Sequence, residues 1–100
     1  MANYKLTNKA VSDLKLIWNY TFDNWSEKQA DKYYNMLIDN CNEISRNPSL
    51  GKSYPEIFKD ILGLRVGKHI IFYLEDRNNE IEIIRILHEQ MDLKNRIKEK

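Results

Sequence analysis

Residues 25–30, WSEKQA, decide the fold of this chain, because they end one helix and begin the next with almost no loop between them. Ser26 and Gln29 have the spacing of a capping box. In this motif the Ser26 hydroxyl accepts a hydrogen bond from the Gln29 N–H, and the Gln29 side chain returns to the Ser26 N–H. Apolar residues recur every three or four positions on both sides of the box. The sequence therefore predicts an antiparallel hairpin of two amphipathic helices.

Each helix of the hairpin has one apolar face. Thr7 can cap the first helix, since its hydroxyl can accept a hydrogen bond from a first-turn N–H. The second helix is expected to stop near Asn47-Pro48, because proline restricts the residue before it. The apolar faces comprise Val11, Leu14, Trp18, Phe22 and Trp25, and then Ala30, Tyr33, Leu37, Cys41 and Ile44. Spacing of this kind predicts core positions, rather than a base-stacking surface, for Trp18, Phe22, Trp25, Tyr33 and Phe72.

Segments typical of β-strands flank the hairpin. A short alternating segment at 3–7 precedes it, and β-branched and aromatic runs at 61–66, 69–74 and 81–87 follow it. Short connections make the last three runs antiparallel neighbours. Asp92 can cap a closing turn of helix that contains Leu93 and Ile97. The predicted fold class is α+β, in the order β-α-α-β-β-β-(α), with the hairpin packed on a small antiparallel sheet in a single domain of residues 1–100.

Charge and cysteine content exclude several classes of protein. Sixteen Lys and Arg face fifteen Asp and Glu, for a net charge of +1, whereas a dedicated nucleic-acid binder carries a larger excess. Cys41, the one cysteine, cannot form an intramolecular disulfide or a structural zinc site. No apolar run has the length of a signal-peptide core or a membrane span. We therefore expect a cytoplasmic protein with no membrane contact.

The end of the chain, residues 94–100, is locally basic, with Glu99 as its one acid. Cations favour the C-terminal end of a helix dipole, so this pattern is typical of a solvated last helix. It is equally typical of a binding surface. Both interpretations stay open at this point.

Several kinds of catalytic site lack their motifs. Three glycines cannot build a Gly-rich phosphate loop or a dinucleotide fingerprint. The segment from His88 to Asp92 opens like the zinc-binding motif HExxH, but its fifth residue is Asp92 rather than histidine. No serine lies in a GxSxG nucleophile elbow. We therefore predict neither a metal site nor a cofactor.

Arg65 is a candidate binding residue within the strand at 61–66. Its neighbours two positions away are Gly63 and Gly67, which leave room for another chain to approach a guanidinium suited to carboxylate or phosphate. Alternatively, Arg65 lies over an exposed sheet face and pairs with Glu82 or Glu75.

Arg85 and His88 are candidates in the last strand. In a regular strand Arg85 shares a face with Ile81, Ile83 and Leu87, whereas His88 points to the opposite side. A joint acid–base role would therefore need a bulge or a turn before His88. Otherwise Arg85 is a snorkelling residue with an ion-pair partner, and His88 is a strand-end histidine bonded to the backbone.

Motifs along nearly the whole chain resemble those of one family. They are Leu6-Thr7, Asp13-Leu14, Ile17 and Tyr20, Trp25 with Gln29-Ala30, Asn47-Pro48 with Gly51, Gly63-Leu64-Arg65, His69 with Ile71-Phe72-Tyr73, and Ile84 to His88 followed by Met91-Asp92. In this order the chain resembles the ParE branch of the RelE/ParE toxin superfamily of bacterial toxin–antitoxin systems. The resemblance implies the same layout of elements and a cognate antitoxin whose C-terminal segment wraps the toxin in a hetero-oligomer. Candidate antitoxin contacts, chosen by expected exposure, are Tyr20, Tyr34 and Arg65.

Two activities occur in this superfamily. ParE-like members inhibit DNA gyrase and block replication, whereas RelE-like and YoeB-like members cleave mRNA in the ribosomal A site. Arg65 and Arg85 match arginines of the nuclease branch, and His88 falls at a histidine of the YoeB-like members. Glu89 follows His88 where those members have tyrosine, and its carboxylate would repel a phosphate.

The resemblance therefore favours a gyrase inhibitor that is not an enzyme, with no catalytic residues, no cofactor and no direct contact with nucleic acid. The expected gyrase contacts are Arg65, Met91, Asp92, Lys94 and Arg96. The alternative is a ribosome-dependent mRNA endonuclease that uses Arg65, Arg85 and His88.

Overall fold

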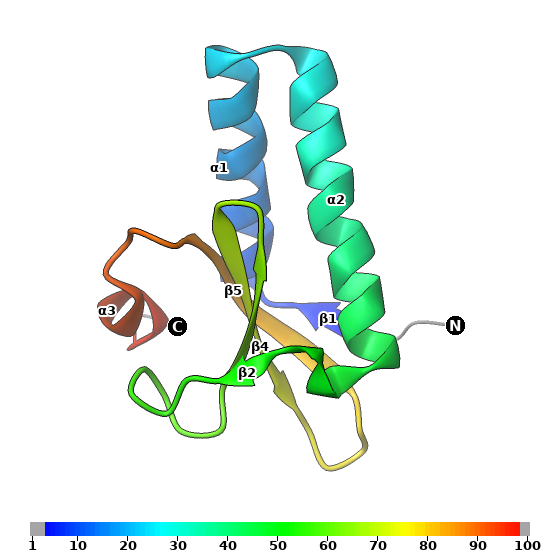
Figure 1. Cartoon of the computed structure of the whole chain (residues 1–100), viewed down its shortest axis with the longest axis vertical. Coiled ribbons are helices and arrows are strands. Elements are labelled where there is room, and N and C mark those ends of the chain that lie inside the picture. The colour runs from blue at the N-terminus through cyan, green and yellow to red at the C-terminus, as the bar shows by residue number, and fades with distance from the viewer. Residues whose placement is uncertain (1–3, 99–100) are drawn as a thin grey trace.

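The computed structural model describes residues 4–98 and shows a helical hairpin that stands on a five-stranded sheet (Figure 1). In chain order the elements are β1 (Tyr4–Leu6), α1 (Asn8–Asn24), α2 (Glu27–Arg46), the 3-10 turn η1 (Pro48–Leu50), β2 (Lys52–Ser53), β3 (Leu62–Val66), β4 (His69–Glu75), β5 (Ile81–His88) and α3 (Leu93–Lys98). The predicted α+β class and order are confirmed, and Asn3 of the expected first strand lies outside the described residues. Strand β2 is an addition, since two residues are too few to show a period.

The predicted helix ends are confirmed by their capping contacts. Thr7 Oγ1 accepts a hydrogen bond from Ala10 N at 3.0 Å, and Ser26 Oγ accepts one from Gln29 N at 3.1 Å. Helix α2 ends at Arg46, directly before Asn47. Short polar side chains at these positions satisfy N–H groups that have no partner inside the helix.

The sheet has the strand order β1-β5-β4-β3-β2, and it is mixed rather than wholly antiparallel. Strands β2 to β5 pair antiparallel, as predicted. Strand β1 pairs parallel to β5, with Tyr4 opposite Ile81. The prediction of a purely antiparallel sheet is wrong at this strand. A parallel neighbour needs a long crossover connection, and the helical hairpin with the strands after it supplies one.

A β-bulge divides strand β5 into two parts. Phe72 of β4 pairs with Arg85, but the next residue, Tyr73, pairs with Ile83, which leaves Ile84 as the extra residue. Directly opposed residues lie on the same face of a sheet. Arg85 therefore lies on the face of Phe72, whereas Ile83 lies on the face of Tyr73. The prediction that Arg85 shares a face with Ile81 and Ile83 is wrong, because the bulge reverses the alternation.

Both faces of the sheet are covered by apolar clusters. The cluster under the hairpin comprises Ala10, Leu14, Leu37, Cys41, Ile44, Val66, Ile71, Tyr73, Ile81, Ile83 and Ile86. A second cluster lies under α3 and comprises Ile61, Ile70, Phe72, Leu87 and Ile97. Thus the closing helix predicted around Ile97 packs on the face that the hairpin leaves open.

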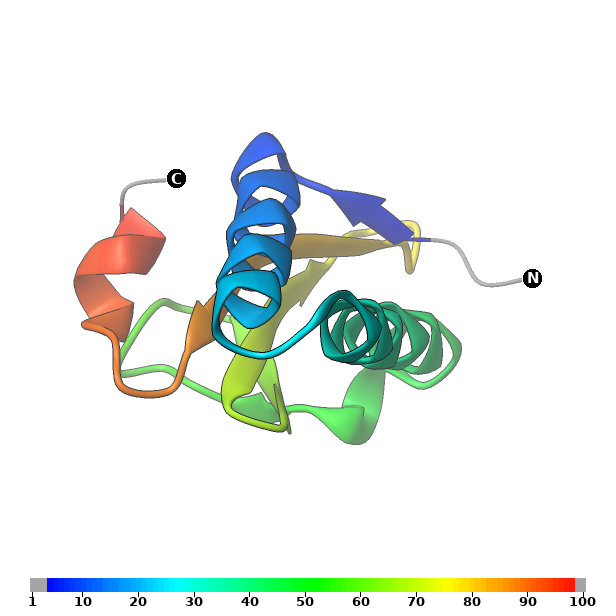
Figure 2. The same cartoon turned by 90° about the horizontal axis from the view of Figure 1, so that it is seen from above.

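The outer half of the hairpin contradicts one prediction. Phe22 stacks on Trp18 with ring centroids 5.3 Å apart, but Phe22 and Trp25 are exposed, Trp25 to 74%. Trp18 and Tyr33 are half-buried, and only Phe72 of the five predicted core aromatics is fully buried. Figures 1 and 2 show why, since the hairpin extends beyond the sheet and its outer turns have only each other as neighbours.

Candidate functional site

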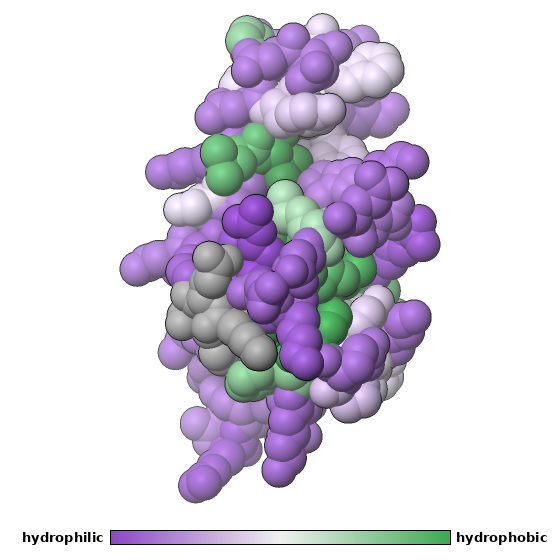
Figure 3. Space-filling model, turned by 90° about the vertical axis from the view of Figure 1, so that its left-hand side faces the viewer, coloured by the Kyte–Doolittle hydropathy of each residue, from purple (hydrophilic) through white to green (hydrophobic). Residues whose placement is uncertain are grey.

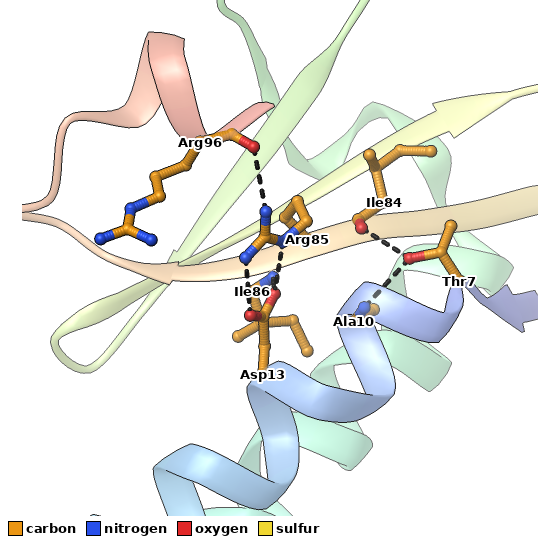
Figure 4. Close-up of polar contacts among 7 residues, drawn as sticks. All are labelled: Thr7, Ala10, Asp13, Ile84, Arg85, Ile86 and Arg96. Atoms are coloured by element: carbon orange, nitrogen blue, oxygen red, sulfur yellow. Dashed lines mark hydrogen bonds and ion pairs between the residues drawn. The ribbon is translucent and has the colours of Figure 1, made fainter. Parts of the chain in front are cut away.

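Arg85 forms a buried ion pair with Asp13 of α1 (Figure 4). Arg85 Nε donates to Asp13 Oδ2 at 2.8 Å, and Arg85 Nη2 donates to Asp13 Oδ1 at 2.9 Å. Ile86 N donates to the same carboxylate at 3.0 Å. The two side chains keep only 10% and 8% of their surface exposed. The predicted ion-pair partner is confirmed, but the guanidinium is buried rather than snorkelling, because it is enclosed between Asp13 of α1 and the Arg96 carbonyl of α3.

Arg65 is also paired, but with a different residue from those predicted. Arg65 Nη2 lies 2.6 Å from Glu89 Oε2, and the Arg65 side chain is 66% exposed. Glu89 N donates to Lys68 O at 3.0 Å, which brings the end of β5 to the turn beside Arg65. The prediction of Glu82 or Glu75 as the partner is therefore wrong.

The space beside the two glycines around Arg65 is filled by this chain itself. A Cβ atom at Gly63 would lie 2.7 Å from the ring of Tyr54, and one at Gly67 would lie 2.8 Å from Tyr33 Oη. Gly67 also has a φ of +60°, which favours glycine. The expected room for another chain at these glycines is thus taken by two tyrosines.

A shallow hollow of about 660 Å³ remains next to Arg65. Its lining includes Lys52, Tyr54, Arg65, Glu89 and Gln90. Lys52 Nζ lies 5.2 Å from the centre of the Tyr54 ring, within the range of a cation–π contact. The hollow therefore combines two cations with one carboxylate.

His88 belongs to a cluster that includes His69 and Tyr33. Gln90 N donates to His88 Nδ1 at 3.1 Å, which confirms the predicted backbone bond of a strand-end histidine. The His69 and His88 rings meet edge to face at 5.3 Å, and Tyr33 Oη lies 2.6 Å from His69 Nδ1. Burial, together with His88, lowers the pKa of His69 to about 4, so its ring is neutral at pH 7. Sequence analysis missed Tyr33 here, because 36 positions separate it from His69 and no local pattern connects them.

The structure does not assemble Arg65, Arg85 and His88 into one catalytic set. Beyond the bulge the pairing of β5 with β4 is regular, so Arg85 and His88 point to opposite sides, as predicted. Arg85 binds Asp13, and Arg65 binds Glu89. Within residues 4–98, no group of three His, Cys, Asp or Glu could hold a metal ion. None of the helices in the same range is long and apolar enough to cross a membrane.

The expected contact residues for partners are exposed, but they lie on separate elements. Tyr20 on α1 is 68% exposed, Tyr34 on α2 is 37% exposed, and Arg65 lies on β3. The expected gyrase contacts after β5 are exposed as well: Met91, Asp92, Lys94 and Arg96. Asp92 Oδ2 accepts from Asn95 Nδ2 at 2.6 Å at the start of α3. Of the basic tail, Glu99 and Lys100 lie outside the described residues.

Comparison with known proteins shows three similar toxins. The "Toxin ParE1" of Mycobacterium tuberculosis is 32% identical over 92% of this chain and 94% of that protein. The "Toxin ParE1" of Caulobacter vibrioides is 30% identical with the same coverage. The "Toxin ParE" of Escherichia coli is 30% identical over 97% of this chain and 94% of that protein.

Two solved structures share the fold. A chain described as "Chromosomal ParDE TA system from P. aeruginosa" has a TM-score of 0.74 at 20% identity, covering 88% of this chain and 96% of that one. A chain of the RelBE2 toxin–antitoxin complex from Mycobacterium tuberculosis has a TM-score of 0.68 at 18% identity, covering 88% and 98%. These two likenesses support the hairpin-on-sheet architecture.

The family is shown by a match over most of the sequence. The family model described as "ParE toxin of type II toxin-antitoxin system, parDE" matches residues 4–93. That range contains the ion pairs of Arg65 and Arg85 and the whole sheet, and the three toxins above agree with it at 30–32% identity. This chain therefore belongs to the ParE toxin family of type II toxin–antitoxin systems.

Proposed function

We propose that this toxin binds DNA gyrase in the cytoplasm, inhibits it and thereby blocks replication, without itself catalysing a reaction. The observation that carries this proposal is the burial of Arg85 in its ion pair with Asp13. A nuclease needs an accessible cation that can bind a phosphate and stabilise the charge of the transition state. Arg85, one of the two arginines that match the nuclease branch, is held inside the protein. Family membership supports the same conclusion.

The surroundings of Arg65 also count against RNA cleavage. The Glu89 carboxylate lies 2.6 Å from the Arg65 guanidinium and would repel a phosphate that approached it. A net charge of +1 provides little attraction toward a polyanion. The mRNA endonuclease, with Arg65, Arg85 and His88 as its site, is therefore the less favoured function.

For the gyrase contact we propose the segment from Met91 to Arg96 together with Arg65. Met91 is 43% exposed, and Lys94 and Arg96 present cations on the outer side of α3. An exposed apolar side chain surrounded by charges is typical of a protein-binding surface, and arginine is enriched in such surfaces. Arg65 on β3 and the segment from Met91 to Arg96 after β5 would then contact gyrase together.

We also propose that a cognate antitoxin neutralises the toxin by folding its C-terminal segment onto the hairpin and the sheet. The hairpin exposes large apolar side chains, among them Leu16 at 66%, Tyr20 at 68% and Trp25 at 74%. Figure 3 shows hydrophobic patches between hydrophilic residues on the side of α1 and α3. Coupled folding of a disordered segment could cover such a surface. Tyr20, Tyr34 and Arg65 are the proposed contacts in this hetero-oligomer.

The first experiment induces this chain in bacteria without an antitoxin and measures incorporation of labelled thymidine and labelled methionine within minutes. An earlier fall in thymidine incorporation supports gyrase as the target. An earlier fall in methionine incorporation overturns the proposal in favour of the nuclease. Purified gyrase then tests the contact surface. If Arg65→Ala and a truncation after Gln90 both keep full inhibition of supercoiling, the assignment of that surface is wrong.

A further inference from the structure

Helix α3 depends on the rest of the protein for its structure. It comprises six residues, Leu93–Lys98, and isolated helices of fewer than about 12 residues are marginal in water. The last four carbonyl groups of any helix also lack partners within it. Contacts with other elements must therefore fix both the existence and the orientation of α3.

Contacts of two kinds fix α3, apolar ones through Leu93 and Ile97 and a polar one through a backbone carbonyl. Ile97 is fully buried and packs in the cluster that contains Phe72 and Leu87. On the polar side, Arg85 Nη1 donates to the backbone carbonyl of Arg96 at 2.9 Å (Figure 4). That carbonyl is one of the four without a partner in the helix. The guanidinium thus satisfies an acceptor and places positive charge at the negative end of the helix.

The aim of Arg85 at α3 is set by Asp13. Two nitrogens of the guanidinium, Nε and Nη2, bind the two oxygens of the Asp13 carboxylate. A planar guanidinium held at two points has no freedom to turn, so its third nitrogen is fixed toward Arg96. In addition, Ile86 N donates to Asp13 Oδ2, which fixes the carboxylate against β5. Helix α1, strand β5 and helix α3 therefore meet at one guanidinium.

We propose that Arg85, held by Asp13, is a positioning residue that caps α3 and sets the orientation of the surface carrying Lys94 and Arg96. The proposal rests on the proposed function, in which that surface contacts gyrase. Arg85 itself touches no target and acts through the helix. A catalytic arginine must be accessible to its substrate. Arg85 acts in the opposite way, because its burial is what holds it against Asp13 and the Arg96 carbonyl.

The test compares two variants that loosen α3 by different routes. Arg85→Lys keeps a positive charge beside Asp13, but one ammonium lacks the planar fork that also reaches Arg96. Ile97→Ala loosens the apolar contact and leaves the ion pair intact. Arg46→Lys is the matched control, because Arg46 pairs with Glu43 on the exposed end of α2. Hydrogen exchange of residues 93–98 and of β4 is measured, together with the concentration that half-inhibits supercoiling by purified gyrase. All measurements are made where circular dichroism shows folded protein.

We expect exchange in α3 to accelerate about tenfold more than exchange in β4 in both Arg85→Lys and Ile97→Ala. The half-inhibitory concentration should rise at least about tenfold in both variants, and Arg46→Lys should match the wild type.

Unchanged α3 exchange in Arg85→Lys would overturn the capping role. Faster exchange with unchanged inhibition would overturn the link to the binding surface. If the wild type does not inhibit gyrase, the proposed function fails, whereas the exchange data still decide the capping role. Should Arg85→Lys not fold, Ile97→Ala decides whether the position of α3 matters for inhibition.

Discussion

Arg85 and Arg65 bind carboxylates in opposite surroundings. At the junction of α1, β5 and α3, the side chains of Arg85 and Asp13 are 10% and 8% exposed, and two hydrogen bonds join them. Beside the hollow next to β3, the Arg65 side chain is 66% exposed and joins Glu89 at one point. If the pair is broken, water can reach Arg65 and, in part, Glu89, whose side chain is 21% exposed, but it can reach neither Arg85 nor Asp13. The comparison therefore teaches that an arginine–carboxylate pair can have two roles. The Arg85–Asp13 pair stabilises the fold, whereas the Arg65–Glu89 pair forms part of an accessible surface.

The largest expected effect breaks the buried pair. Asp13→Ala leaves the Arg85 guanidinium buried without its counter-charge, so the free energy of unfolding should fall by about 3–5 kcal/mol. Urea denaturation followed by circular dichroism measures this loss. Glu43→Ala is the control, since it breaks the exposed pair with Arg46 and should cost less than about 1 kcal/mol. Equal losses in the two variants would contradict the distinction between buried and exposed pairs.

A neutral buried contact sharpens the comparison by separating burial from charge. Tyr73 Oη donates to Pro48 O at 2.6 Å and accepts from Gly51 N at 2.8 Å, and the side chain is fully buried. Tyr73→Phe leaves both backbone groups without this partner, so the free energy of unfolding should fall by about 2 kcal/mol. Tyr20→Phe, at an exposed position, should change it by less than about 0.5 kcal/mol. A Tyr73→Phe variant as stable as the wild type would contradict a structural role for this hydroxyl.

His69 is half-buried, and so lies between the buried and the exposed sites. Its pKa predicts that the free energy of unfolding depends on pH. Its pKa in the folded protein is lowered to about 4 from 6.5, so between these values the unfolded chain binds more protons. The contribution of the neutral His69 ring to the free energy of unfolding is therefore fully present above pH 6.5 and is lost as the pH falls toward 4. Between pH 7 and pH 5 the wild type should lose about 1 kcal/mol more stability than His69→Gln, after allowance for solvent screening. Parallel losses in urea denaturation at the two pH values would contradict the shift.

The helix ends and the Arg85 site differ in how far the sequence predicts them. Caps at Thr7 and Ser26 and the end of α2 follow from neighbouring residues, and the structure has all three. The bulge at Ile84 has no such signal, because the extra residue is an isoleucine like Ile83 before it and Ile86 after Arg85. Consequently the face of Arg85 could not be predicted. Its partner Asp13 lies 72 positions away, beyond the reach of any local pattern.

The outer half of the hairpin shows the same limit from another side. Phe22 and Trp25 keep the helical spacing of the core residues, yet they are exposed. Spacing specifies which side chains share a helix face, but the length of the sheet beneath the helix decides which of them are covered. That length depends on how strands from the other end of the chain pair with one another. Core position along a helix is thus a property of the whole fold.

The smallest expected effect on stability tests the exposed side of the comparison. Arg65→Ala removes a guanidinium that water already surrounds, so the free energy of unfolding should change by less than about 0.5 kcal/mol. Under the proposed function, the same variant should nevertheless inhibit purified gyrase more weakly, because it lacks a charge of the binding surface. Arg46→Ala serves as the control for both readouts, since Arg46 is an exposed, paired arginine outside that surface. A stability loss above about 2 kcal/mol in Arg65→Ala would place this pair with the buried one, since losses of that size come from buried contacts. Contact with gyrase would then no longer explain why an arginine occupies this exposed position on β3.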